Sequence, residues 1–274
     1  MNNRDTDYSS LDRGDIPSLL FHPRKDNRPV PHFVNNVERF NIPVDNEIEV
    51  GAMLHRAERT DPFILFFHGN GEVVSDYMDA GSFFTGVGIN LLVADYRGYG
   101  WSGGSPTVSS MMTDCHTVFS FVEDRLNKEG YTGPLIVMGR SLGSACALEI
   151  AYRHEVSIDG LIIESGFAHT LSLLRVIGAD VDALGIDEDA GFGNIEKIKR
   201  YRKPLLVIHA ENDHVIPFAQ GVALFEECPS RVKKLVKIAR ADHNNIFYYG
   251  AETYMSAIKD FAAAIDSTGG DRSR

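Results

Sequence analysis

Residues 134–148 read PLIVMGRSLGSACAL, a short apolar run followed by a serine between glycines. The apolar run 134–138 predicts a buried strand, and residues 142–154 predict the helix that follows it. Between them, GRSLG at 139–143 fits the pattern G-x-S-x-G in the strand–turn–helix context that a nucleophile elbow requires. The sequence therefore predicts a nucleophile at Ser141. The alternative is a Gly/Ser turn that matches the pattern by accident.

The alternation of strands and helices continues on both sides of this stretch. Further apolar runs that predict strands lie at 62–67, 90–94, 158–163, 204–209 and 234–238, and helical spacing recurs at about 74–86, 107–126, 219–228 and 248–265. Two strands at 37–44 and 47–55 have no helix between them, which predicts an antiparallel pair at one edge. The pattern predicts an α/β fold, with a mostly parallel central sheet of about eight strands and helices on both faces.

One domain is expected to span residues 31–266. Residues 1–30 are interpreted as an N-terminal arm with short turns, and residues 267–274 as a flexible tail. Residues 169–202 mix apolar side chains with glycines between two predicted strands, so a short lid is expected there. An apolar lid favours a pocket for an acyl chain, and ordinary packing of helices on the sheet is the alternative.

The 274-residue chain carries a formal net charge of −11. A chain this acidic repels phosphate backbones, so no nucleic-acid partner is expected. Two basic clusters are interpreted either as a solvated loop and strand edge or as a docking site for an anionic substrate group. Their members are Lys197, Lys199, Arg200, Arg202 and Lys203 in the first cluster, and Arg231, Lys233, Lys234 and Lys237 in the second.

Cysteine usage and hydropathy predict the compartment. The three cysteines, Cys115, Cys146 and Cys228, are too few for a disulfide framework and fit a reducing environment. No Cys/His cluster suggests zinc, so no metal is expected. Neither a signal-peptide core nor a run of ~18 apolar residues is present, so a cytoplasmic protein without a membrane span is expected.

A serine nucleophile needs a base, and the base needs an acid to orient it. His243 follows the last predicted strand and precedes the last helix, which makes it the candidate base. Asp213, after the strand at 204–209, is the candidate acid, and Glu164, after the strand at 158–163, is the alternative acid. A surface-loop histidine and an Asx turn are the purely structural interpretations of His243 and Asp213.

An oxyanion hole needs two backbone N–H groups that point at the developing negative charge. Leu142, directly after the nucleophile, is one expected donor. The loop after the strand at 62–67 reads HGNG at 68–71, and its small residues let the backbone approach a substrate. Asn70 is the second expected donor, with Gly71 as the alternative, whereas His68 is expected to hold the loop.

Five motifs follow one another in a familiar order: HGNG at 68–71, DYRGYG at 95–100, GRSLG at 139–143, NDH at 212–214 and DHN at 242–244. In these motifs, spread over roughly residues 35–265, the chain resembles the α/β-hydrolase superfamily, especially serine-aminopeptidase-like hydrolases and protein-depalmitoylating thioesterases. The chain order Ser, Asp, His is the order of that superfamily. The resemblance assigns GYGWSG at 98–103 to a hydrolase loop and not to a dinucleotide site, because Pro106 delays the next helix.

The reaction that these residues predict is acyl transfer. Ser141 attacks the carbonyl of an ester or thioester, His243 moves the proton, and water releases the acyl-enzyme, without metal or organic cofactor. A peptidase or amidase with the same triad and a non-catalytic binding protein are the alternatives. The sequence specifies a small-molecule or acylated substrate, but not its acyl chain, its leaving group or the oligomeric state.

Overall fold

The computed structural model describes residues 7–26, 33–34 and 36–268. Within them, one nine-stranded sheet has the order β1-β2-β3-β5-β4-β6-β7-β8-β9. Its strands are β1 (Phe33–Val34), β2 (Val37–Pro43), β3 (Glu49–His55), β4 (Phe63–Phe67), β5 (Asn90–Ala94), β6 (Leu135–Arg140), β7 (Gly160–Glu164), β8 (Leu205–Ala210) and β9 (Lys233–Ile238).

The sheet is parallel from β5 to β9 and antiparallel at the edge formed by β1, β2 and β3. The predicted α/β fold with a mostly parallel sheet is confirmed. The ninth strand is the two-residue β1. It was not predicted, because two residues are too few to show an alternation of apolar and polar side chains. Parallel strands direct their carboxyl ends to one edge, so the loops after β4, β6, β8 and β9 can meet there.

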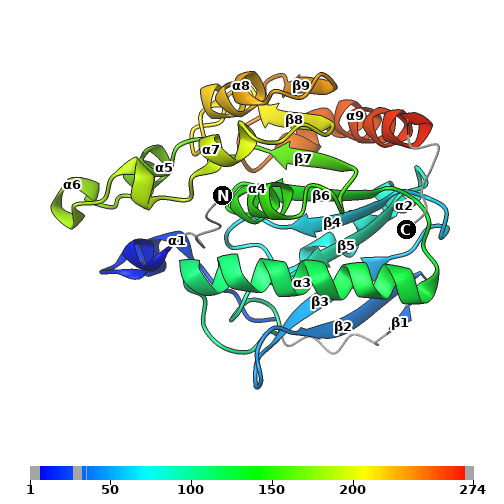
Figure 1. The fold of residues 1–274 in the computed structure, drawn as a ribbon, viewed down its shortest axis with the longest axis horizontal. Helices are drawn as coiled ribbons and strands as arrows, with labels where there is room; N and C mark the ends of the chain where they lie inside the picture. The colour runs from blue at the N-terminus through cyan, green and yellow to red at the C-terminus, as the bar shows by residue number, and fades with distance from the viewer. Residues whose placement is uncertain (1–6, 27–32, 35, 269–274) are drawn as a thin grey trace.

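Helices cover both faces of the sheet. The longer ones are α3 (Val108–Glu129), α4 (Gly143–Arg153), α8 (Phe218–Glu227) and α9 (Ile246–Thr268), and Figure 1 shows α3 and α4 on the near face. Strand β4 shows why both faces are apolar: Phe63, Leu65 and Phe67 join the buried cluster with α3 and α4, whereas Ile64 and Phe66 join the cluster with α9. A strand buried on both faces reads as a continuous apolar run.

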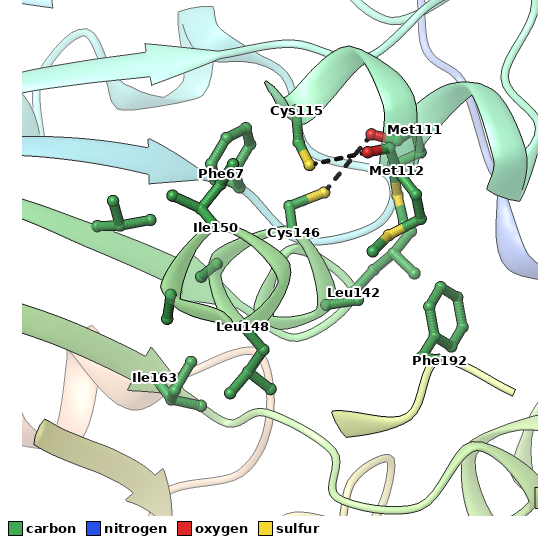
Figure 2. Packing of buried hydrophobic residues seen from close by; sticks show 14 of the residues in the cluster. Phe67, Met111, Met112, Cys115, Leu142, Cys146, Leu148, Ile150, Ile163 and Phe192 are labelled. Atoms are coloured by element: carbon green, nitrogen blue, oxygen red, sulfur yellow. Dashed lines mark hydrogen bonds between the residues drawn. The ribbon is translucent and has the colours of Figure 1, made fainter. Parts of the chain in front are cut away.

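Apolar packing around α4 holds the helix that follows Ser141. Figure 2 shows Cys146 of α4 facing Cys115 of α3 among Phe67, Leu142 and other apolar side chains. The Cys115 thiol donates to the Met112 carbonyl oxygen at 3.1 Å, and all three cysteines are free and buried. These thiols therefore pack as small apolar side chains.

Two segments differ from the sequence expectation. The single helix expected at about 74–86 is instead the 3-10 helix η2 (Val74–Tyr77) and the short helix α2 (Gly81–Thr85). Val74 N–H donates to the Asp95 carboxylate at 3.0 Å, so this backbone is tied to a neighbouring loop. Helix α9 continues to Thr268, so the tail expected from 267 begins inside a helix, and 269–274 lie outside the described residues.

The N-terminal segment packs against the rest of the molecule. Its 3-10 helix η1 (Ser9–Asp12) and helix α1 (Ile16–Leu20) bury Leu11, Ile16 and Leu20 in the main core. The Asp12 carboxylate accepts the Val108 N–H at 2.6 Å, at the start of α3. The described part of the expected arm, residues 7–26, is therefore part of the packed domain.

Four short helices lie between β7 and β8 in residues 169–202, the segment expected to form a lid and called the lid segment below. They are α5 (Thr170–Val176), α6 (Val181–Leu184), η3 (Glu188–Ala190) and α7 (Asn194–Ile198). Figure 1 shows α5 and α6 projecting from the body on the same side as α1. The Ser10 hydroxyl donates to the Ala190 carbonyl oxygen at 2.9 Å, so the N-terminal segment and the lid segment are in contact.

Candidate active site

Ser141 lies on the sharp turn between β6 and α4. Its φ of 51° is positive, an uncommon conformation for a residue with a side chain. The Ser141 N–H donates to the Glu164 carbonyl oxygen at 2.9 Å, and a Cβ at Gly143 would lie 2.1 Å from the Phe67 carbonyl oxygen. Only glycine fits at Gly143, so the GRSLG sequence and the tight turn belong together.

The structure brings the side chains of Ser141, His243 and Asp213 together. The His243 Nε2 lies 2.9 Å from the Ser141 Oγ, and the His243 Nδ1 lies 2.7 Å from the Asp213 Oδ2. Each of the three residues is less than a tenth exposed. The other carboxylate oxygen, Asp213 Oδ1, accepts the N–H groups of Val215 and Ile216 at 3.0 and 2.7 Å. The carboxylate is therefore held on both sides.

The charge of Asp213 follows from its partners. Burial alone would raise the pKa of its carboxyl group, but the hydrogen bond and charge of His243, with the Ile216 N–H, leave that pKa below its ordinary value. Asp213 is thus an anion beside His243 Nδ1, an arrangement that holds the ring with Nε2 toward the serine.

Glu164 has different partners. It ends β7, and its Oε2 accepts a hydrogen bond from the Tyr254 hydroxyl of α9 at 2.7 Å. Its Oε1 lies 3.7 Å from Arg140 Nη1, and burial raises the pKa of Glu164. The side chain of the alternative acid, Glu164, is therefore hydrogen-bonded to Tyr254 of α9.

The loop that follows β4 is held by buried polar contacts. His68 Nε2 lies 3.0 Å from the Asp95 Oδ1, and the Tyr96 hydroxyl donates to the His68 carbonyl oxygen at 2.6 Å. The side-chain oxygen of Asn70 accepts the Tyr99 hydroxyl at 2.7 Å. The loop comes close to the serine at Gly69, where an added Cβ would lie 3.5 Å from the Ser141 Cβ.

The N-terminal segment is hydrogen-bonded to the loop at 68–71 through His22. The His22 N–H donates to the Asn70 Oδ1 at 2.8 Å, and the His22 Nδ1 lies 2.9 Å from the Asn70 Nδ2. Leu142, the other expected oxyanion donor, precedes the first turn of α4, where backbone N–H groups lack intrahelical acceptors. Of the two expected donors, Leu142 therefore directly follows Ser141 in the chain, and Asn70 lines the same pocket as Ser141.

A pocket of about 340 Å³ opens at Ser141. Three apolar side chains from distant segments line it: Leu19 of α1, Ile177 after α5 and Val215 after β8. His22, Glu72 and Arg140 also line it. No role was predicted for Leu19, His22 or Glu72 from the sequence, in which the apolar run before His22 is the signal for the first two.

The basic clusters lie elsewhere. Lys197 is buried, with its Nζ 2.7 Å from the Glu149 Oε2, and the Lys233 Nζ donates to the Phe225 carbonyl oxygen at 2.7 Å. No member of either cluster lines the pocket at Ser141. Lys197 and Arg200 line a different pocket, beside α7.

Comparison with known proteins identifies the family. The model of the family described as serine aminopeptidase, S33, matches residues 58–174. Alpha/beta hydrolase domain-containing protein 17C of Xenopus tropicalis is 30% identical over 250 residues, which cover 89% of this chain and 76% of that protein. The chain belongs to the α/β-hydrolase superfamily. Alpha/beta hydrolase domain-containing protein 17B of Homo sapiens is 31% identical over 204 residues, 73% of this chain and 66% of that protein.

A solved structure agrees with the fold of this α/β hydrolase. The esterase Pf2001 of Pyrococcus furiosus superposes with a TM-score of 0.69 at 16% identity, over 88% of this chain and 99% of that chain. Among residues 7–26, 33–34 and 36–268, no three His, Cys, Asp or Glu side chains are grouped to hold a metal ion. In the same described part of the chain, every helix is too short or too polar to cross a membrane.

Proposed function

We propose that this α/β hydrolase is a serine hydrolase that cleaves a carboxylic ester or thioester through an acyl-enzyme. Ser141 is the nucleophile, His243 the general base and Asp213 the acid that orients it. The observation that carries the proposal is the continuous hydrogen-bonded chain from the Ser141 Oγ through the imidazole to the buried Asp213 carboxylate. A serine with that partner at a nucleophile elbow has a proton acceptor at hand.

The reaction proceeds by two transfers. His243 Nε2 accepts the Ser141 proton as Oγ attacks the substrate carbonyl, and the backbone N–H groups of Leu142 and Asn70 stabilise the oxyanion. His243 then protonates the leaving group, and the acyl group stays on Ser141. Water, deprotonated by the same imidazole, releases the acid. Each oxyanion donor is typically worth about 3 kcal/mol of transition-state stabilisation.

The pocket favours esters and thioesters over peptides. Leu19, Ile177 and Val215 offer an apolar wall to an acyl group, and the volume of about 340 Å³ is at the small end for ligand pockets. A peptidase or amidase with the same three residues is the second candidate, since the matching family model is described as a serine aminopeptidase.

Two measurements on the purified chain test this proposal. A fluorophosphonate probe should label Ser141 covalently, and a panel should rank p-nitrophenyl esters and acyl-thioesters above aminoacyl amides in kcat/KM. Faster turnover of the amides would replace the esterase by the amidase. A chain that neither labels nor turns over any substrate would be a binding protein instead.

Activity should fall with a single ionisation as the pH is lowered, because a histidine base must be neutral to accept the serine proton. Asp213 adds no second proton in this fall, because the partners that lower its pKa keep it charged. The measurement is kcat/KM against pH. A limb with a slope of two, or a flat profile into the acid range, would contradict a histidine base with an ionised acid.

Replacing His22 by alanine should lower kcat about fivefold, because one side-chain hydrogen bond to Asn70 is worth about 1 kcal/mol. The matched control is His169→Ala, which changes an exposed lid histidine that does not line this pocket. Equal kcat values for the two variants would show that His22 does not support the oxyanion loop.

A further inference from the structure

A charged pair lies where the three loops of the proposed active site meet. Arg140 directly precedes Ser141, and Glu72 directly follows the HGNG loop. The Arg140 Nε donates to the Glu72 Oε1 at 2.9 Å, and the two side chains are 12% and 25% exposed. Such a pair costs desolvation energy, which a surface pair would avoid.

Each member of the pair also holds a second loop. The Glu72 Oε2 accepts the Gly69 N–H at 2.7 Å and the Tyr77 hydroxyl at 2.8 Å. The Arg140 Nη2 donates to the backbone carbonyl oxygen of His243 at 3.0 Å. Direct hydrogen bonds therefore run from the nucleophile elbow to the oxyanion loop and to the histidine loop.

We propose that Glu72 and Arg140 are positioning residues that hold the oxyanion loop and the histidine loop in register around Ser141. The inference rests on the proposed function and deepens it. Neither residue exchanges a proton with the substrate. They act through two backbone groups, the Gly69 N–H and the His243 carbonyl, on either side of the nucleophile.

The charge states support this arrangement. Burial alone would raise the pKa of Glu72, but the charges of Arg140 and His68 leave that pKa below its ordinary value. Burial opposes the charge of Arg140, and the carboxylates of Glu72 and Glu164 outweigh it and raise the pKa of the guanidinium. Glu164 lies 3.7 Å from Nη1, an atom without a hydrogen-bond partner, so Nε and Nη2 set the orientation of the side chain.

Removing the guanidinium should loosen both loops at once. The partly buried Glu72 and the buried Glu164 would then lack their shared cation, a costly state that drives side chains to reorient. Reorientation of Glu72 releases the Gly69 N–H. A displacement of about 1 Å in a catalytic site can cost about 10²-fold in rate.

The experiment compares Arg140→Met, Arg140→Lys, Glu72→Gln and the double variant Glu72→Gln/Arg140→Met. Arg140→Met should lower kcat about 10²-fold with KM within about threefold of wild type. Arg140→Lys should recover part of the loss, because lysine keeps the charge but not the two-armed geometry. The double variant should be no worse than Arg140→Met, since residues of one network are not additive.

A matched control is Arg125→Met, which removes another largely buried arginine, the one on α3 that lies 2.6 Å from Glu38 of β2, without touching the three loops. Melting temperatures show which variants fold. If Arg140→Met does not fold, the kcat of Glu72→Gln is compared with that of the control instead. Three results would overturn the inference: kcat within about threefold of wild type, a loss no larger than that of Arg125→Met, or a change confined to KM, which would indicate substrate binding.

Labelling of Ser141 by a fluorophosphonate distinguishes failure of the proposed function from failure of the proposed role of Glu72 and Arg140. A wild-type chain that neither labels nor turns over an ester would overturn the proposed function and the pair's role with it. A wild-type chain that labels, beside an Arg140→Met variant that labels at the same rate, would overturn the pair's role alone.

Discussion

Ser141→Ala should reduce ester turnover on the order of 10⁵–10⁶-fold. Only the residual rate that substrate binding and the oxyanion hole provide should remain. The reason is the loss of the single oxygen that lies 2.9 Å from the His243 Nε2. The fold should persist, because the elbow is set by close backbone approaches at Gly143 and by the Ser141 N–H bond to Glu164, which alanine keeps.

The measurement is kcat on the best ester of the panel, with the melting temperature recorded beside it. Ser230→Ala is the control, because Ser230 is a buried serine whose hydroxyl donates to the Val232 carbonyl, between α8 and β9. Turnover by Ser141→Ala close to the wild-type rate would remove the serine from the mechanism.

Asp213→Asn should lower kcat by about 10⁴-fold, because an amide next to the His243 Nδ1 favours the wrong tautomer of the imidazole. The Asp213 Oδ2 lies 2.7 Å from that nitrogen, and the backbone bonds of Oδ1 should keep the turn in place.

Glu164→Gln is the comparison that decides between the two candidate acids. Its loss should be far smaller, because the Glu164 Oε2 accepts the Tyr254 hydroxyl and a glutamine oxygen can accept the same bond. If Glu164→Gln lost most of its activity while Asp213→Asn kept it, the acid assignment would be reversed. The contact between Ser141 and His243 would not be affected by that result.

The parts of the fold that could be predicted are those that neighbouring residues determine. The apolar run before GRSLG, the two glycines and the small residues after them specify a strand, a tight turn and a helix without reference to distant residues. The prediction of a single helix over 74–86 was wrong: two short helices, η2 and α2, form there instead. Tyr77, at the end of η2, packs its ring against Phe66 of β4, a tertiary contact that helical spacing along the chain does not encode.

The sequence by itself determined the α/β class, the elbow at Ser141 and the presence of Asp213, His243 and Glu164 after strands, because these follow from local patterns. Only the tertiary structure decided which carboxylate meets the imidazole. Glu164 ends β7, the strand next to β6, whereas Asp213 follows the more distant β8, yet Asp213 makes the contact.

The same holds for the walls of the site. His22 meets Asn70 across 48 positions of sequence, and Arg140 meets Glu72 across 68. Strand order, loop path and packing bring such pairs together, and no spacing along the chain encodes them. Local sequence therefore determined which chemical groups this protein carries, and the folded sheet decided which of them lie within hydrogen-bond distance.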